Sequence, residues 1–265
     1  MRNPQIKTIT ALKVVFVSLV LSTQAAYTQG IEPGDWLNRM TIAVQRTNYE
    51  GTVIRIQDGT ADALKVIHVV SDGVIREKVI IQEGQDLEII RNGSEVRFIM
   101  PERKSVVVEQ WDDKSTLFST LPSSDIRFGS EYDVSIVRKE RVAGRKTVVL
   151  AIRPHDSFRY GHRVWLDIAT AFPLQTKLLD EHGDIIEQVK FAEITFNTEF
   201  DDDALQPSID IDDFRWYTKP RRTVTNEVVS DWVSDNLPSG FVLTSTRAER
   251  VTGSDEPITH MMFSD

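Results

Sequence analysis

The side chains that most often do chemistry in proteins are sparse and scattered in this chain. It contains no cysteine, which excludes disulfides, thiolate catalysis and cysteine-containing zinc sites. None of its five histidines belongs to an H-x-x-x-H or H-E-x-x-H arrangement. The sequence also has no G-x-S-x-G elbow and no Walker or Rossmann glycine pattern. We therefore expect a binding protein rather than an enzyme, with no cofactor.

Two aspartate-rich runs are the candidates for a metal site. They are Asp201-Asp202-Asp203 and Asp210-Ile211-Asp212-Asp213, and they lack the spacing, the Gly and the Glu of an EF-hand loop. Such runs usually cap a helix or face water, so we expect no metal. His68 and His162 fall within predicted strands, where we expect structural, hydrogen-bonded histidines, and His182 falls in a turn, where we expect it to be solvated.

The elements that must position these side chains are mostly strands. Short runs rich in Val and Ile alternate with turn dipeptides that end in Gly, of which Asn92-Gly93 is the clearest and indicates a type I′ turn. Strands joined by such short turns pair antiparallel. The predicted strands are 52–57, 64–70, 74–82, 86–91, 95–100, 104–109, 132–141, 145–153, 162–167, 173–180 and 185–196.

So many strands in one sheet must curl. We predict an α+β fold in which a strongly bent antiparallel sheet forms a half barrel. An amphipathic helix over 35–47 and a less regular segment over 112–128 would pack in its concavity. Val96, Phe98 and Met100 alternate on one face of their strand and Arg97 points the other way, which predicts one apolar and one wetted face.

An incompletely covered concave face makes an apolar groove, and lipid is the ligand that such a groove suits. The aromatic and aliphatic side chains expected there are more often plain core, so both interpretations stay open. Trp111 and Phe118 are candidates for a lid over the groove. The candidate groove residues are Trp36, Met40, Val96, Phe98, Met100, Trp111, Phe118 and Leu174.

The first 25 residues have the three parts of a secretory signal. A basic head with Arg2, Lys7 and Lys13 precedes an apolar run over 14–21, and small residues follow. The apolar run is shorter than the about 20 residues that a membrane span needs. We predict a cleavable signal peptide over 1–25 and a soluble protein in a bacterial periplasm, with the outside of the cell as the alternative.

The surface of the exported protein is acidic. Removing residues 1–25 takes away three cations and no acid, which moves the formal net charge from -9 to -12. Negative charge repels phosphates, so we expect no nucleic-acid partner. An acidic surface suits a basic protein partner, although solubility alone explains it. The oligomeric state stays open, a homo-oligomer included.

Composition changes near the C-terminus indicate a second domain. The stretch from Asp201 to Asp213 is acidic and broken by Pro207, and the basic segment Lys219-Pro220-Arg221-Arg222 follows. We predict a large domain over 31–215, a linker over 216–226 and a small domain over 227–265. Its strands are predicted at 240–247 and 258–263. About forty residues are marginal for an independent domain, so we expect it to be incomplete, poorly ordered and weak in binding a partner.

One block of sequence is distinctive enough to carry a resemblance. It begins Arg159-Tyr160-Gly161-His162-Arg163-Val164-Trp165-Leu166-Asp167 and continues to Phe191. Together with Asn48-Tyr49-Glu50-Gly51-Thr52-Val53 and the tail His260-Met261-Met262-Phe263, it resembles the RseB/MucB family, over nearly the whole mature chain. The family usually has Gly-Leu where this chain has Ala171-Phe172, and it continues past Asp265 with further strands.

The resemblance implies a function. Members are periplasmic negative regulators of the envelope-stress sigma factor sigma-E or AlgU, with a lipoprotein-carrier-like large domain. They bind the periplasmic part of a membrane-bound anti-sigma factor of the RseA/MucA type and shield it from proteolysis. Lipid or lipopolysaccharide releases them. The residues expected to contact the partner are Arg221, Arg222, Trp232 and Phe241.

Two other functions remain to be weighed against this one. A periplasmic lipid or lipoprotein carrier would use the groove alone, without a second domain. An enzyme would need a polar groove residue whose mutation abolishes a hydrolase activity.

Overall fold

The computed structural model describes residues 31–84, 86–111, 131–196, 199–219, 234, 236–249 and 258–264. All the described helices and strands belong to one compact unit, Glu32–Asp265. The predicted signal peptide, the segment 112–128 and most of the linker lie outside the described residues. No helix among the described residues is long and apolar enough to cross a membrane.

Strands dominate the described residues. In chain order the elements are α1 (Pro33–Arg46), β1 (Tyr49–Gln57), β2 (Thr60–Ser71), β3 (Val74–Ile81), β4 (Glu88–Asn92), β5 (Glu95–Met100), η1 (Pro101–Arg103), β6 (Ser105–Gln110), β7 (Tyr132–Val142), β8 (Arg145–Pro154), β9 (Gly161–Asp167), β10 (Pro173–Leu179), β11 (Ile185–Phe196), η2 (Asp202–Leu205), β12 (Arg215–Thr218), β13 (Val242–Glu249) and β14 (Ile258–Ser264). The predicted strands all form, with bounds shifted by a few residues.

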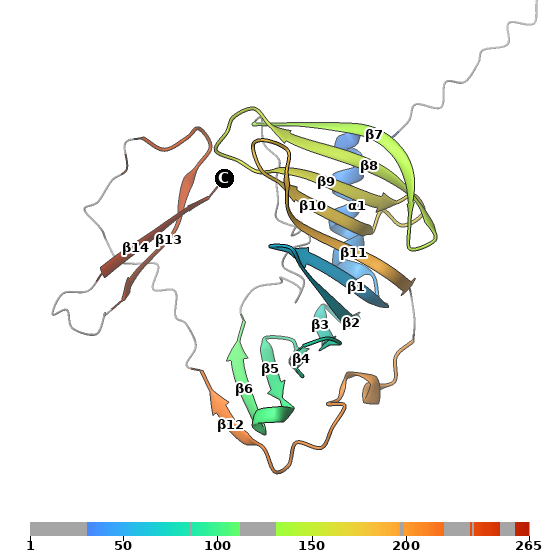
Figure 1. Cartoon of the computed structure of the whole chain (residues 1–265), viewed down its shortest axis with the longest axis vertical. Helices are drawn as coiled ribbons and strands as arrows, with labels where there is room; N and C mark the ends of the chain where they lie inside the picture. The colour runs from blue at the N-terminus through green and yellow to red at the C-terminus, as the bar shows by residue number, and fades with distance from the viewer. Residues whose placement is uncertain are drawn as a thin grey trace, which may run out of the picture. The chain divides into compact units, whose positions relative to one another are not determined.

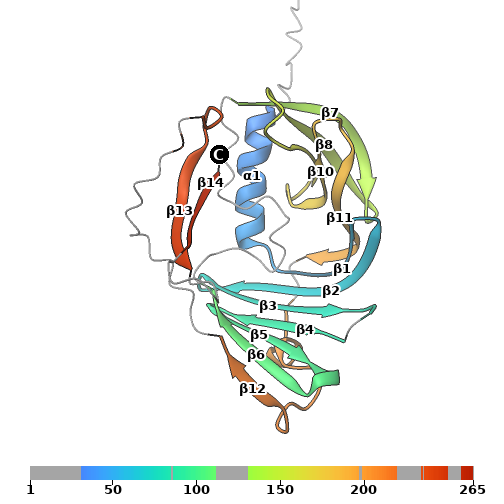
Figure 2. The same cartoon turned by 60° about the vertical axis from the view of Figure 1, so that its left-hand side comes forward.

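Twelve of these strands form one bent, open sheet (Figures 1 and 2), in the order β12-β6-β5-β4-β3-β2-β1-β11-β10-β9-β8-β7. Two antiparallel meanders, β1 to β6 and β7 to β11, join where β1 pairs with β11. The half-barrel prediction is confirmed. Strand β12 pairs parallel with β6 and was not predicted, because four exposed residues carry no alternating pattern.

The predicted turns form, with one correction. Asp58-Gly59 and Ala143-Gly144 have positive φ at both residues, as a type I′ turn requires. At the hairpin between β4 and β5 the two loop residues are instead Gly93 and Ser94, and Gly93 has φ 62°. Positive φ at the first loop residue alone is the type II′ pattern. The type I′ prediction for Asn92-Gly93 was wrong because Asn92 still pairs with Glu95.

Helix α1 lies inside the bend of the sheet, against the β7–β11 half (Figure 2). Pro33 occupies its first turn, where the missing N–H costs no hydrogen bond, and Asp35 complements the helix dipole. Its buried residues follow helical spacing: Trp36, Met40, Ala43 and Val44. The prediction of a helix in the concavity is confirmed.

An aromatic cluster fills the middle of the sheet where the two meanders meet. The Tyr49 ring lies 4.9 Å from Phe172 and 5.7 Å from Phe191, centroid to centroid, and stacks on His68 at 5.0 Å. Gly51 permits the close approach of β1 and β11, since a Cβ there would lie 2.5 Å from the Glu193 carbonyl oxygen. The motif around Tyr49 is therefore a packing motif.

The face that carries Arg97 is not simply wetted, which corrects the expectation of one apolar and one polar face. Ile90, Ile99 and Val106 are buried on it, with Ile211 and Phe214 packed over them. Leu205 likewise packs on Ile67 and Val69. The covering residues belong to the acidic stretch between β11 and β12, which we call the strap (residues 199–214). Its apolar residues, spaced between aspartates, bind it to the convex face of the sheet.

The remaining strands form a hairpin. Strands β13 and β14 pair antiparallel in a sheet of two, close to the predicted ranges 240–247 and 258–263. The linker predicted at 216–226 overlaps β12, so its first residues pair with β6 in the large sheet. The division into a large and a small domain stays a prediction.

Candidate functional site

A pocket of about 250 Å³ lies at strands β5 and β6 on the face of the sheet opposite the strap, the concave face. These two strands belong to the end of the sheet away from α1 (Figure 2). The floor of the pocket is apolar and comes from strands β5 and β6 and the residue before β4. Phe98 and Met100 share a face of β5, and Val107 lies opposite Phe98 on β6. The lining residues are Asp86, Leu87, Phe98, Met100, Glu102, Arg103, Val107, Glu109 and Lys219.

The rim of this pocket is charged. Lys219 and Arg103 supply cations, and three carboxylates lie at Asp86, Glu102 and Glu109. An apolar floor beneath cations that can meet an anionic group is the arrangement that an amphiphile requires. The volume lies below the range of about 300–1,000 Å³ that encloses drug-sized ligands, so one short acyl chain fits better than several.

Glu109 connects the pocket to two neighbouring segments. One carboxylate oxygen accepts from Lys219 Nζ, and the other accepts from Trp111 Nε1 at 3.2 Å. The Trp111 ring lies 6.4 Å from Phe98 and under the Arg91 guanidinium at 5.9 Å. Trp111, a candidate lid residue, therefore lies beside the pocket floor.

The other candidate groove residues divide into two groups. Phe98, Met100 and Trp111 are half-buried and gather at the pocket. Trp36, Met40, Val96 and Leu174 are buried in the core, where they offer no open surface to a ligand. Phe118 lies outside the described residues. The pattern of apolar residues along a strand could not distinguish these groups, because it gives the face but not what covers it.

Of the candidate partner-binding residues, Arg221, Arg222 and Trp232 lie outside the described residues. Phe241 is described and half-buried, with the Arg159 guanidinium 4.8 Å above its ring. The Arg159 side chain is only 1 % exposed, pairs with Asp156 and donates to the Ser239 carbonyl. Phe241 therefore has an intramolecular partner.

His68 and Glu77 form a buried polar pair in the core of the sheet. His68 Nδ1 lies 2.7 Å from Glu77 Oε1, and both side chains are buried. Burial, with the nearby Glu77 charge, raises the pKa of Tyr49 well above its ordinary value of 10.0. His68 is thus a hydrogen-bonded core histidine, as expected, and His182 is 75 % exposed in its turn.

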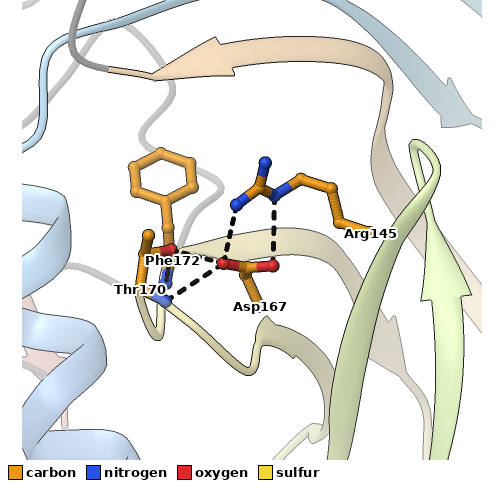
Figure 3. A network of polar contacts seen from close by, with 4 residues as sticks. All are labelled: Arg145, Asp167, Thr170 and Phe172. Atoms are coloured by element: carbon orange, nitrogen blue, oxygen red, sulfur yellow. Dashed lines mark hydrogen bonds and ion pairs between the residues drawn. The ribbon is translucent and has the colours of Figure 1, made fainter.

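A polar network fixes the turn after β9 (Figure 3). Asp167 accepts two hydrogen bonds from Arg145, both at 3.1 Å, and two from Thr170, at 3.0 Å from the amide and 2.9 Å from the hydroxyl. Asp167 N donates to the Phe172 carbonyl oxygen at 2.9 Å. This network places Phe172 in the aromatic cluster.

Comparison with known proteins decides the family. The family model of the MucB/RseB N-terminal domain matches residues 32–209. The chain belongs to the MucB/RseB family. MucB of Pseudomonas aeruginosa is 29% identical over 239 residues, which are 90% of this chain and 72% of MucB. RseB of Escherichia coli K12 is 26% identical over 258 residues, 96% of this chain and 79% of RseB.

Solved MucB structures share the fold. The complex of Pseudomonas aeruginosa MucA and MucB matches with a TM-score of 0.67 at 27% identity, over 89% of this chain and 77% of that one. MucB alone matches with a TM-score of 0.58 at 26% identity, over 88% of this chain and 76% of that one. In this MucB/RseB member, the distinctive block at 159–191 holds Arg159, Asp167 and Phe172, which pack and pair within the chain.

Sequence reasoning missed the polar residues around the pocket. Glu109 and Lys219 are far apart in sequence, and each looks like an ordinary surface charge until β12 pairs with β6. The described residues contain no group of three or more His, Asp or Glu side chains placed to hold a metal ion.

Proposed function

We propose that this chain is a periplasmic negative regulator of the envelope-stress response that binds the periplasmic part of a membrane-bound anti-sigma factor. Its likeness to MucB in complex with MucA(peri) carries the proposal, with a TM-score of 0.66 over 88% of this chain and 27% identity. The family match over residues 32–209 supports the same role. A binding protein of this kind needs no catalytic group.

Regulation would follow from steric protection. A bound regulator covers a segment of the anti-sigma factor, and a protease cannot cut a covered segment. The basic-headed segment over 1–25 supports export to the periplasm, where that segment of the partner lies. The candidate contacts remain Arg221, Arg222, Trp232 and Phe241.

Release would come from an amphiphile that binds the concave pocket. The apolar floor at Phe98 and Met100 and the cations at Lys219 and Arg103 support a ligand with an acyl chain and an anionic group, as lipid or lipopolysaccharide offers. The volume of about 250 Å³ favours entry of one chain.

The test is a binding titration between the purified chain and the periplasmic segment of the anti-sigma factor from the same organism. We expect a Kd of about 1 μM or lower and slower cleavage of the segment by an added protease. The cytoplasmic segment of the same anti-sigma factor is the control. Absence of binding to the periplasmic segment by the whole chain would refute the proposal.

A second candidate is a periplasmic lipid or lipoprotein carrier. The pocket on the concave face favours it, since a carrier needs only that site. Transfer of a lipidated protein between two membrane preparations would support this function. A chain that binds the anti-sigma segment but transfers no lipidated protein would exclude it.

A further inference from the structure

We propose that strand β12 is a ligand-responsive strand: an amphiphile in the concave pocket takes Lys219 from Glu109 and detaches β12 from β6. This inference rests on the proposed function for its biological meaning, but its structural basis is independent of any partner. The ligand would have one short acyl chain and an anionic group, and β12 is the element that responds to it.

Lys219 belongs to the pocket and to the sheet edge at once. Its ammonium group lines the pocket and contacts Glu109, while its backbone N–H donates to the Val108 carbonyl at 2.9 Å. The side chain is 66% exposed, so water screens the ion pair and a second anion can compete for the ammonium. An anionic group at the rim therefore meets a cation whose position is coupled to β12.

Strand β12 is held weakly. It has four residues, all exposed, lies at the end of the sheet order and pairs only with β6. Beyond the backbone bonds, the Arg97 guanidinium lies 5.6 Å from the Trp216 ring centroid. Short, exposed edge strands open locally at low free-energy cost. Among the strands at and beside the pocket, β12, which directly precedes the lining residue Lys219, is thus the one that a small change in contacts can release.

Glu109 connects Lys219 with Trp111 at the edge of the pocket. Its carboxylate accepts from Trp111 as well as from Lys219. Trp111 ends the β5–β6 hairpin region, and its N–H donates to the Ser94 carbonyl at 2.8 Å. Loss of the Lys219 contact leaves Glu109 beside the incoming anion, and like charges repel. Glu109 must then rotate away, which also breaks its hydrogen bond from Trp111.

The consequence is a change at the edge of the large sheet, where residues 215–219 leave β6. When β12 is paired, Lys219 has a fixed position on the sheet edge. When β12 is released, the strap still holds the convex face through Leu205 and Phe214, so the freed chain begins near residue 215. Occupancy of the pocket is thereby converted into the release of residues 215–219 from the sheet edge.

Amide hydrogen exchange tests this directly, with decyl phosphate as the probe below its micelle concentration. We expect the Lys219 amide to exchange about tenfold faster with the probe, while amides of β4 and β5 keep their rates. Decanol lacks the anion and inorganic phosphate lacks the chain, so each should change the rate less than about twofold. Failure of decyl phosphate to bind, or binding without faster exchange in β12, would overturn the proposal.

Two changes, each with a control, separate the release of β12 from simple ligand binding. In Glu109→Gln, the Lys219 amide should exchange faster without any probe and respond less when the probe is added. Glu181→Gln, in the exposed β10–β11 turn, is the control and should behave as the unmodified chain. A disulfide between Val108→Cys and Thr218→Cys, which are register partners, should abolish the response to decyl phosphate. Because the chain has no other cysteine, reduction of this disulfide is the matched control.

Binding of the anti-sigma segment is measured in a separate experiment. If decyl phosphate weakens binding of the anti-sigma segment, the oxidised double-cysteine form should keep its affinity and the reduced form should lose it. An oxidised form that is still released would refute the role of β12. If no form binds the segment, the proposed function fails, while the exchange experiment still decides whether β12 responds to the pocket.

Discussion

At the scale of single residues, Ala171 has a backbone conformation that is unusual for alanine. Its φ is 62°, in the left-handed region that favours glycine. The Asp167 network holds the turn in this conformation, since Thr170 and Phe172 bond on either side of Ala171. Phe172, the next residue, packs against Tyr49 and Phe196 in the aromatic cluster. The backbone strain at Ala171 and the packing of Phe172 therefore occur at neighbouring residues.

Ala171→Gly should stabilise the protein. Relief of left-handed strain, about 1–2 kcal/mol, exceeds the entropy that glycine adds to the unfolded chain, so we expect a gain of about 0.5–1 kcal/mol. Urea unfolding monitored by tryptophan fluorescence measures it. Ala143→Gly, at φ 47°, should have the same sign, and Ala43→Gly in helix α1 the opposite one. Destabilisation at 171 would contradict the argument.

Residue roles were predictable only where they follow from local pattern. The alternation of apolar residues in β5 correctly placed Phe98 and Met100 on one face of the strand, and both side chains line the pocket. The structural role of His68 followed from its position inside a strand. Glu109 and Lys219 could not be predicted, because their contact depends on the parallel pairing of β6 with a strand whose sequence has no strand pattern.

At the scale of elements, the strap is the feature that composition concealed. Its aspartate runs were expected to cap a helix or face water, yet Lys78 and Glu88 anchor the strap from the convex face. Their buried side chains lie 2.9 Å apart, and Glu88 also accepts from the Ser208 amide at 3.0 Å. Strands and helix were predicted well because their periodicity is strong. The strap was not predicted, since the apolar residues that hold it to the sheet follow neither a helical nor a strand period.

Glu88→Ala should detach the strap and destabilise the fold. It leaves the Lys78 ammonium buried without its carboxylate, and breaking a buried pair costs about 3–5 kcal/mol. Thermal or urea unfolding measures the loss, and limited proteolysis should show new cleavage between 199 and 214. The control is Arg76→Ala, which removes an exposed pair with Asp202 and should cost less than about 1 kcal/mol. Equal losses in both variants would exclude this role for Glu88.

At the scale of the whole molecule, Arg159 connects the loop between β8 and β9 to the segment that precedes β13. Its contacts to Ser239 and Phe241 are the reason that Arg159 is buried while Phe158 and Tyr160 beside it are exposed. The family resemblance drew attention to Arg159 through its sequence block. Its role could not be predicted, because the partner residues lie about eighty positions later in the chain.

Arg159→Ala should loosen the segment 236–241. Loss of a charged hydrogen bond and of the stacked ring removes about 2 kcal/mol of local stability, and amides there should exchange correspondingly faster. Arg159→Lys keeps the charge but not the planar fork, so it should restore only part of the protection. Arg153→Ala, an exposed neighbour, serves as the control. Unchanged exchange in Arg159→Ala would show that other contacts hold this segment.

The pairing of β1 with β11 limits how early the large sheet can form during folding. Tyr49, at the start of β1, pairs with Phe196, at the far end of β11. Until this pairing forms, the meander from β1 to β6 exposes an unpaired edge and half of the aromatic cluster. Such edges invite pairing with other chains, and contacts this distant in sequence form slowly. The meander from β1 to β6 is therefore prone to aggregate until residues 185–196 are available to pair with β1.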